Sequence, residues 1–197
     1  MSHCNIDPES FHRYVFRPIN SNMYMLIEGD EALIIDPFRS QSAMLALNTA
    51  GVRKILILLT HENYDHTSGV NWLRENFDCH LICQKHCAAS IADRRNNRPM
   101  LTIMAMVAAD REKARKTLRE IEPYVCSADE SFDQEMCLSW QGYSLHLIAT
   151  PGHTPGSCCI ELGKQIVFTG DSWLEGKDVL TRLPGGNRTD FDNKTVP

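Results

Sequence analysis

Three apolar stretches of this sequence end in the same way, and this repetition constrains the fold more than any other feature. KILILL is followed at Thr60 by HENYDH, LHLIA at Thr150 by PGHTPGS, and QIVF at Thr169 by GDS. Short apolar runs bounded in this way predict buried strands, and a rigid sheet presents functional residues on the loops at its strand ends. If the three strand ends lie side by side, their potential ligands meet at one place: His61, Asp65, His66, His153 and Asp171.

The order of the remaining elements indicates α+β layers around mixed sheets. Residues 23–36 read as a β-hairpin around Gly29, and Ser40 or Ser42 can cap a helix over residues 43–50 that ends at Gly51. No linker composition interrupts the chain, so we expect a single domain over residues 1–197. Further helices are expected at 71–77, 85–95 and about 99–121, and further strands at 79–83, 137–140, 143–150, 158–162 and 165–169.

Charge and hydropathy exclude several classes of protein. The formal net charge is −5 and the sequence pI is about 5.9, which gives no electrostatic footprint for nucleic acid or an anionic membrane. The longest apolar runs are far too short to cross a bilayer, and the polar N-terminus has no signal-peptide core. We therefore expect a soluble, cytoplasmic protein that acts on a small molecule. The sequence leaves open whether its copies form a homo-oligomer.

Eight cysteines are many for a chain of 197 residues. A disulfide framework belongs mainly to small secreted domains, so free thiols are the expected state here. Cys158 and Cys159 are adjacent, which is a poor geometry for a disulfide or a joint metal site. We expect no thiolate metal centre.

The histidines and aspartates at the strand ends predict a metal site. Imidazole nitrogen together with carboxylate oxygen suits Zn²⁺, Fe²⁺ or Mn²⁺, and the absence of cysteine ligands argues against a closed structural zinc. Asn63 stands where a third imidazole would be expected, and its amide oxygen is a neutral and weaker donor.

At these residues the chain resembles the metallo-β-lactamase fold superfamily. THENYDHTSG at 60–69 is similar to that family's THxHxDHxxG signature, TPGHTPGS at 150–157 to its second histidine loop, and TGDSW at 169–173 to its aspartate loop. NRTDF at 187–191 also resembles the GRTDF segment of several small hydrolases and of the persulfide dioxygenases. The resemblance covers nearly the whole chain. It implies an αββα sandwich, two mixed β-sheets flanked by helices with the metals at one edge, in the glyoxalase II-like branch.

The resemblance also implies a role for each matching position. A first metal would be held by His61, the residue at position 63 and His153. A second would be held by Asp65, His66 and a late histidine, with Asp171 as a bridge between the two ions. The sequence departs from the family twice: asparagine stands at position 63, and no histidine follows His153. Three arrangements therefore stay open. Asn63 ligates a metal in a lopsided two-metal site, or one ion binds among His61, His153 and Asp171, or one binds among Asp65, His66 and Asp171. The C-terminal element of the family is therefore expected to be missing or truncated in this sequence.

The function that the resemblance implies is hydrolysis of a small thioester, ester or lactone by metal-activated water. The cofactor would be zinc, as one or two ions, with iron or manganese as substitutes, and Asp65 would bind metal and orient the attacking hydroxide. Two alternatives stay open: a catalytically impaired accessory or binding protein of the same fold, and a mononuclear iron dioxygenase of sulfur compounds, which NRTDF favours. Specificity is expected from residues 99–123, where Met100, Met104 and Met106 line an apolar pocket or pack in the core.

Overall fold

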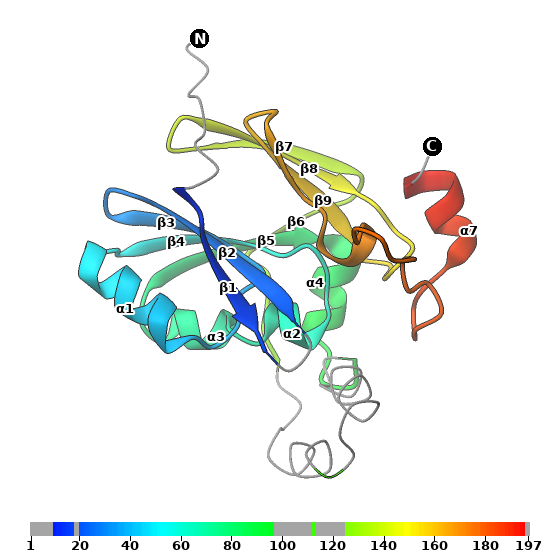
Figure 1. The fold of residues 1–197 in the computed structure, drawn as a ribbon, viewed down its shortest axis with the longest axis horizontal. Helices are drawn as coiled ribbons and strands as arrows, with labels where there is room; N and C mark the ends of the chain where they lie inside the picture. Colours follow the sequence, from blue (N-terminus) through cyan, green and yellow to red (C-terminus); the bar gives the residue numbers. More distant parts are fainter. Residues whose placement is uncertain (1–9, 18–19, 97–111, 113–124, 196–197) are drawn as a thin grey trace.

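Two β-sheets stack face to face, and helices cover the outer face of the first sheet (Figure 1). The computed structural model describes residues 10–17, 20–96, 112 and 125–195. The helix expected at about 99–121, with its three methionines, lies outside these residues except at position 112. Within them, no helix is long and apolar enough to cross a membrane.

The first sheet has six strands in sequence order: β1 (His12–Phe16), β2 (Ser21–Glu28), β3 (Glu31–Ile35), β4 (Lys54–Leu58), β5 (Asp78–Gln84) and β6 (Glu130–Phe132). The predicted hairpin is confirmed, because β2 and β3 are antiparallel and turn at Gly29, which has a φ of 61°. From β3 to β6 the strands are parallel. Their carboxyl ends therefore lie along one edge of the sheet, where ligand sites of such sheets are found.

Three helices lie on the outer face of this sheet: α1 (Gln41–Ala50), α3 (Val70–Arg74) and α4 (Lys85–Ile91). Of the two candidate caps for α1, Ser40 is the one used, since its hydroxyl accepts the Ala43 N–H at 3.3 Å. The helix ends at Gly51, whose φ of 70° is left-handed and favours glycine. A single further turn, α2 (Tyr64–Thr67), follows the end of β4 and carries the Asp65–His66 pair.

The second sheet has four strands in the order β10-β9-β8-β7: β7 (Glu135–Trp140), β8 (Tyr143–Ala149), β9 (Cys158–Leu162) and β10 (Ile166–Phe168). The predicted α+β sandwich of the αββα type is confirmed. One detail differs, since the second sheet is antiparallel throughout rather than mixed. Its strands are joined by short connections, which suit antiparallel neighbours, whereas parallel neighbours need a crossover.

The chain then forms three short helices: η2 (Gly170–Ser172), α7 (Arg188–Asp190) and η3 (Phe191–Thr195).

Alternation along the central strands divides their side chains between two cores. In β3, Ala32 and Ile34 face the helices, whereas Leu33 and Ile35 face the second sheet. All four side chains are at most 1% exposed. Because this strand is buried on both faces, its carboxyl end is held rigidly beside the site described below.

Buried thiols predict a loss of stability at alkaline pH. No disulfide joins the described cysteines. Burial raises the pKa of Cys87 and Cys158 well above the usual 9.0, and that of Cys79 to about 11. The unfolded chain releases these protons near pH 9 while the folded chain keeps them, so the free energy of unfolding should fall as pH rises above about 9. Denaturant titrations on both sides of about pH 9 measure this slope. A double variant, Cys87→Ala with Cys158→Ala, should show a shallower slope, and an equally steep one would contradict the assignment.

Candidate metal centre

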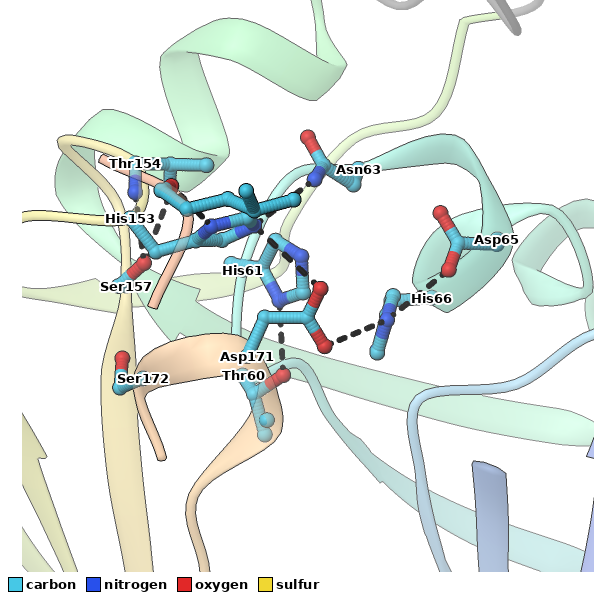
Figure 2. Close-up of polar contacts among 12 residues, drawn as sticks. Thr60, His61, Asn63, Asp65, His66, His153, Thr154, Ser157, Asp171 and Ser172 are labelled. Atoms are coloured by element: carbon cyan, nitrogen blue, oxygen red, sulfur yellow. Dashed lines mark hydrogen bonds and ion pairs between the residues drawn. The ribbon is translucent and has the colours of Figure 1, made fainter. Parts of the chain in front are cut away.

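The ends of β4, β8 and β10 lie side by side, as the repeated pattern predicts. The Cys158 N–H, at the start of β9, donates to Thr60 O at 2.8 Å and ties the end of β4 to the second sheet. Gly170, after β10, packs so closely on Thr60 that a Cβ there would lie 2.3 Å from the threonine Oγ1. The side chains that point toward one another at this edge are His61, His66, His153 and Asp171 (Figure 2).

A buried carboxylate outside the three motifs, Asp36 just after β3, orients both histidines of the first motif. Its Oδ2 lies 2.8 Å from His66 Nδ1 and accepts the Thr60 hydroxyl at 2.6 Å. Because the Thr60 proton is committed to Asp36, the Thr60 oxygen accepts from His61 Nδ1, 3.0 Å away. Both rings are therefore held by Nδ1 with Nε2 facing the cluster, the arrangement that metal-binding histidines use. Asp36 is not among the site residues predicted from the sequence. The feature that could have identified it is an aspartate directly after an apolar strand.

Burial and neighbouring charges set the protonation of the cluster. Burial, with repulsion from His66 and His153, lowers the pKa of His61 well below its usual range, so this ring is neutral near pH 7. For His66 burial acts in the same direction, but Asp65 and Asp36 outweigh it and raise its pKa well above the usual range. Burial would raise the pKa of Asp65, but His66 lowers it. The carboxylates therefore stabilise positive charge at this position, whether a proton or a metal cation supplies it.

The donor atoms fit a bound metal ion. One nitrogen each of His61 and His66 and one oxygen of Asp171 all lie within 4.8 Å of one another. The Nε2 atom of His61 is buried and makes no hydrogen bond to the described residues, whereas the buried Nε2 of His66 faces carboxylate oxygens. A buried polar nitrogen without a partner costs free energy unless something binds it. Asp65 lies beside this group, with its Oδ2 3.0 Å from His66 Nε2.

His153 and Asn63 contact each other at the margin of the cluster. Nδ1 of His153 lies 2.9 Å from the carbonyl oxygen of Leu180, and its Nε2 lies 3.1 Å from Asn63 Nδ2. The same Nε2 is 3.5 Å from Asp171 Oδ2. All six predicted site residues are thus in one region, but their relations differ: three present donor atoms to a common point, while His153 is hydrogen-bonded to Asn63.

A cleft of about 690 Å³ opens beside the cluster. Asn63 lines it, so the cleft begins next to the histidines. Polar side chains from α4 and the two histidine loops form much of its wall, among them Tyr64, His86, Ser90 and Thr154. Its volume falls in the range of small-molecule sites.

The loop that carries His153 is held by residues that the motif comparison does not single out. The Thr154 hydroxyl donates to Glu62 Oε2 at 2.8 Å, and a Cβ at Gly156 would lie 2.4 Å from the same oxygen. On its other side, buried Phe191 packs on Gly152, where a Cβ would meet it at 2.5 Å. The tail, which shows no core pattern in the sequence, is thus anchored against the histidine loop.

Replacing Asp36 with asparagine should weaken metal binding by about 10–100-fold, because an amide cannot accept all three hydrogen bonds that this carboxylate receives. Isothermal titration of chelator-stripped protein with zinc measures the change. Asp30→Asn is the matched control, since Asp30 is exposed and its carboxylate forms an ion pair with Arg53, away from the cluster. Equal zinc affinity in Asp36→Asn and the unchanged protein would contradict the orienting role.

A two-sheet sandwich with histidines and carboxylates gathered at its strand ends is the architecture of the metallo-hydrolase fold. The chain belongs to the metallo-β-lactamase superfamily, whose family model matches residues 16–195. The family expected from the three motifs is therefore confirmed.

Individual relatives agree with this assignment. The probable metallo-hydrolase YqgX of Bacillus subtilis (strain 168) is 28% identical over 173 residues, which cover 87% of this chain and 74% of that protein. Hydroxyacylglutathione hydrolase GloC of Haemophilus influenzae is 27% identical over 167 residues, which cover 82% and 71% of the two chains. Among solved structures, the BLEG-1 B3 metallo-β-lactamase matches with a TM-score of 0.70 and 26% identity, over 93% of this chain and 84% of that one.

Proposed function

We propose that this protein is a metal-dependent hydrolase of a small thioester, ester or lactone. One observation carries the proposal: donor atoms of His61, His66 and Asp171 gather beside a cleft, and the buried Nε2 of His61 has no hydrogen-bond partner among the described residues. The names of the relatives support the reaction class, since YqgX is a probable metallo-hydrolase and GloC a hydroxyacylglutathione hydrolase. An acylglutathione is a thioester, so we place thioesters first among the candidate substrates.

A divalent ion held by His61, His66 and Asp171, for which zinc is our first choice, would supply a Lewis acid and lower the pKa of bound water. Residues of the chain orient the ligands and the attacking water. Asp36 and Thr60 keep the two imidazoles aimed at the cluster. Asp65, whose pKa His66 lowers, stays ionised and accepts a hydrogen bond that orients the attacking water.

The exposure of the cluster indicates where substrate approaches. The side chain of Asp171 is 33% exposed, whereas those of His66 and His153 are 4% and 2% exposed. Water and substrate therefore reach the centre over Asp171, with the rest of the substrate in the cleft. The hydroxyls and imidazole on the cleft wall suit a polar acyl or leaving group.

The test is removal and return of metal with a panel of substrates. Chelator-stripped protein should turn over no thioester, ester or lactone, and reloading with zinc, iron or manganese should restore turnover of at least one class. His61→Ala should stay inactive after reloading. His146→Ala should behave like the unchanged protein, because His146 is a partly exposed histidine paired with Glu135. Metal-loaded protein without turnover would instead indicate an accessory binding protein. Oxygen uptake with persulfide substrates would indicate the dioxygenase alternative.

A further inference from the structure

We propose that Asn63 is a positioning residue that holds His153 by hydrogen bond, and that the centre binds a single metal ion between His61, His66 and Asp171. This inference rests on the proposed function, because it takes the histidine cluster to be a metal centre. It goes further in assigning Asn63 and His153 roles outside the ligand set and in setting the number of ions at one.

The hydrogen bonds of His153 define which of its nitrogens carries the proton. Its Nδ1 lies 2.9 Å from the carbonyl oxygen of Leu180, and a carbonyl oxygen only accepts, so Nδ1 is the donor. In the neutral ring Nε2 then carries the lone pair. Asn63 Nδ2, 3.1 Å away, has only protons to offer and donates one to that lone pair. The atom of His153 that would bind a metal is therefore occupied by an amide proton.

The orientation of the Asn63 amide also argues against Asn63 as a metal ligand. An amide binds a cation through its oxygen, because the nitrogen has no free lone pair. Figure 2 shows the Asn63 nitrogen turned toward His153 and its oxygen turned away from the other side chains. Rotating the amide by half a turn would place its oxygen against Nε2, where two acceptors would face each other. The contact with His153 therefore favours the orientation that keeps the oxygen out of the cluster.

What remains for a metal is one compact donor set. The donor atoms of His61, His66 and Asp171 lie within 4.8 Å of one another. The Nε2 of His61 has no competing hydrogen bond among the described residues, unlike Nε2 of His153. The Nε2 of His66 faces the carboxylates of Asp65 and Asp171, which attract a cation to this position. A second ion beside His153 would have to break the Asn63 contact and would gain only a neutral oxygen in exchange. A histidine at position 63 would favour a second ion, because its imidazole supplies a nitrogen lone pair as a ligand, which the amide nitrogen of Asn63 cannot do.

The experiment compares metal stoichiometry in three proteins. The unchanged protein, Asn63→His and Asn76→His are stripped of metal, reloaded with excess zinc, desalted and analysed by mass spectrometry for zinc per chain. We expect one ion in the unchanged protein, two in Asn63→His, and one in Asn76→His. The last variant controls for an added histidine, since Asn76 is exposed and its side chain donates to the Trp72 carbonyl, away from the cluster.

Any other zinc count overturns part of the inference. Two ions in the unchanged protein would overturn this inference and leave the proposed function standing, whereas no bound ion would overturn both. A folded Asn63→His that still binds one ion would overturn the role given to position 63.

A second measurement needs no folded Asn63 variant. In ¹⁵N-labelled protein loaded with ¹¹³Cd, the Nε2 resonances of His61 and His66 should show coupling to the metal and that of His153 should not. The resonance of His153 is assigned by its loss in His153→Gln. Metal coupling at His153 would overturn the inference regardless of stoichiometry or activity.

Discussion

Replacing His66 with alanine should cost the protein both its metal and much of its stability. His66 is 3% exposed and meets three carboxylates, those of Asp36, Asp65 and Asp171. Removing the imidazole deletes a proposed ligand and leaves Asp36, which is 3% exposed, without its cationic partner. Breaking a buried charge pair in this way typically costs about 3–5 kcal/mol. Metal affinity should fall by about 100-fold or more, since a ligand itself is lost.

Urea unfolding of chelator-stripped protein and zinc titration measure the two effects separately. His80→Ala is the matched control, because His80 is a half-exposed histidine in a 3.5 Å ion pair with Glu130. Its stability should stay within about 0.5 kcal/mol of the unchanged protein, as exposed pairs contribute little. A His66→Ala protein that binds zinc as tightly as the His80→Ala control would refute the place of His66 in the centre.

Replacing Gly69 with alanine should have the second-largest effect, although the residue touches no proposed ligand. Gly69 ends the first histidine motif, and its N–H donates to Pro37 O at 2.8 Å. A Cβ there would lie 2.7–2.8 Å from three backbone atoms of Phe38, and a backbone cannot move aside as a flexible side chain can. Overpacking of this kind costs about 1–3 kcal/mol. It would also push α2 away from the loop that carries Asp36, so the Asp36–His66 contact should loosen and zinc affinity should drop about tenfold.

The measurement is the same pair of titrations, with Ser68→Ala as the neighbouring control. That change adds no atom near Phe38 and should stay within about 0.5 kcal/mol. If Gly69→Ala unfolds at the same urea concentration as Ser68→Ala, the close packing of this motif on the loop after β3 is wrong.

Much of the fold follows from local patterns in the sequence. The hairpin, the capped helix α1 and the strands that precede the three motifs are where the apolar periodicity predicts them. These signals are strong because the strands are buried and their ends are marked by glycine or by serine caps. The strands β1 and β6 are not predicted, since each is at a sheet edge and carries mixed side chains without clear alternation.

The candidate site, too, is predicted from the sequence only where the signal is local. The repeated strand ends predict that His61, His66 and Asp171 meet. They do meet, because β8 and β10 both run antiparallel to β9, so they end at the same edge of the second sheet, beside the end of β4. Sequence spacing could not predict that Asp36 supports both histidines, nor that Phe191 seats the loop of His153, since these contacts join segments about 25–40 residues apart that only the folded sheets bring together. Asn63 is the instructive case. The motif identifies its position as a ligand position, but only the geometry shows its amide nitrogen facing His153.

The central claim is that the histidines at these strand ends hold a metal ion, and anomalous diffraction tests it most directly. Crystals of zinc-loaded protein are measured on both sides of the zinc absorption edge. We expect one anomalous peak about 2.0–2.2 Å from His61 Nε2, His66 Nε2 and an oxygen of Asp171. Well-ordered side chains with no anomalous peak among them, or a peak held elsewhere on the protein, would contradict it.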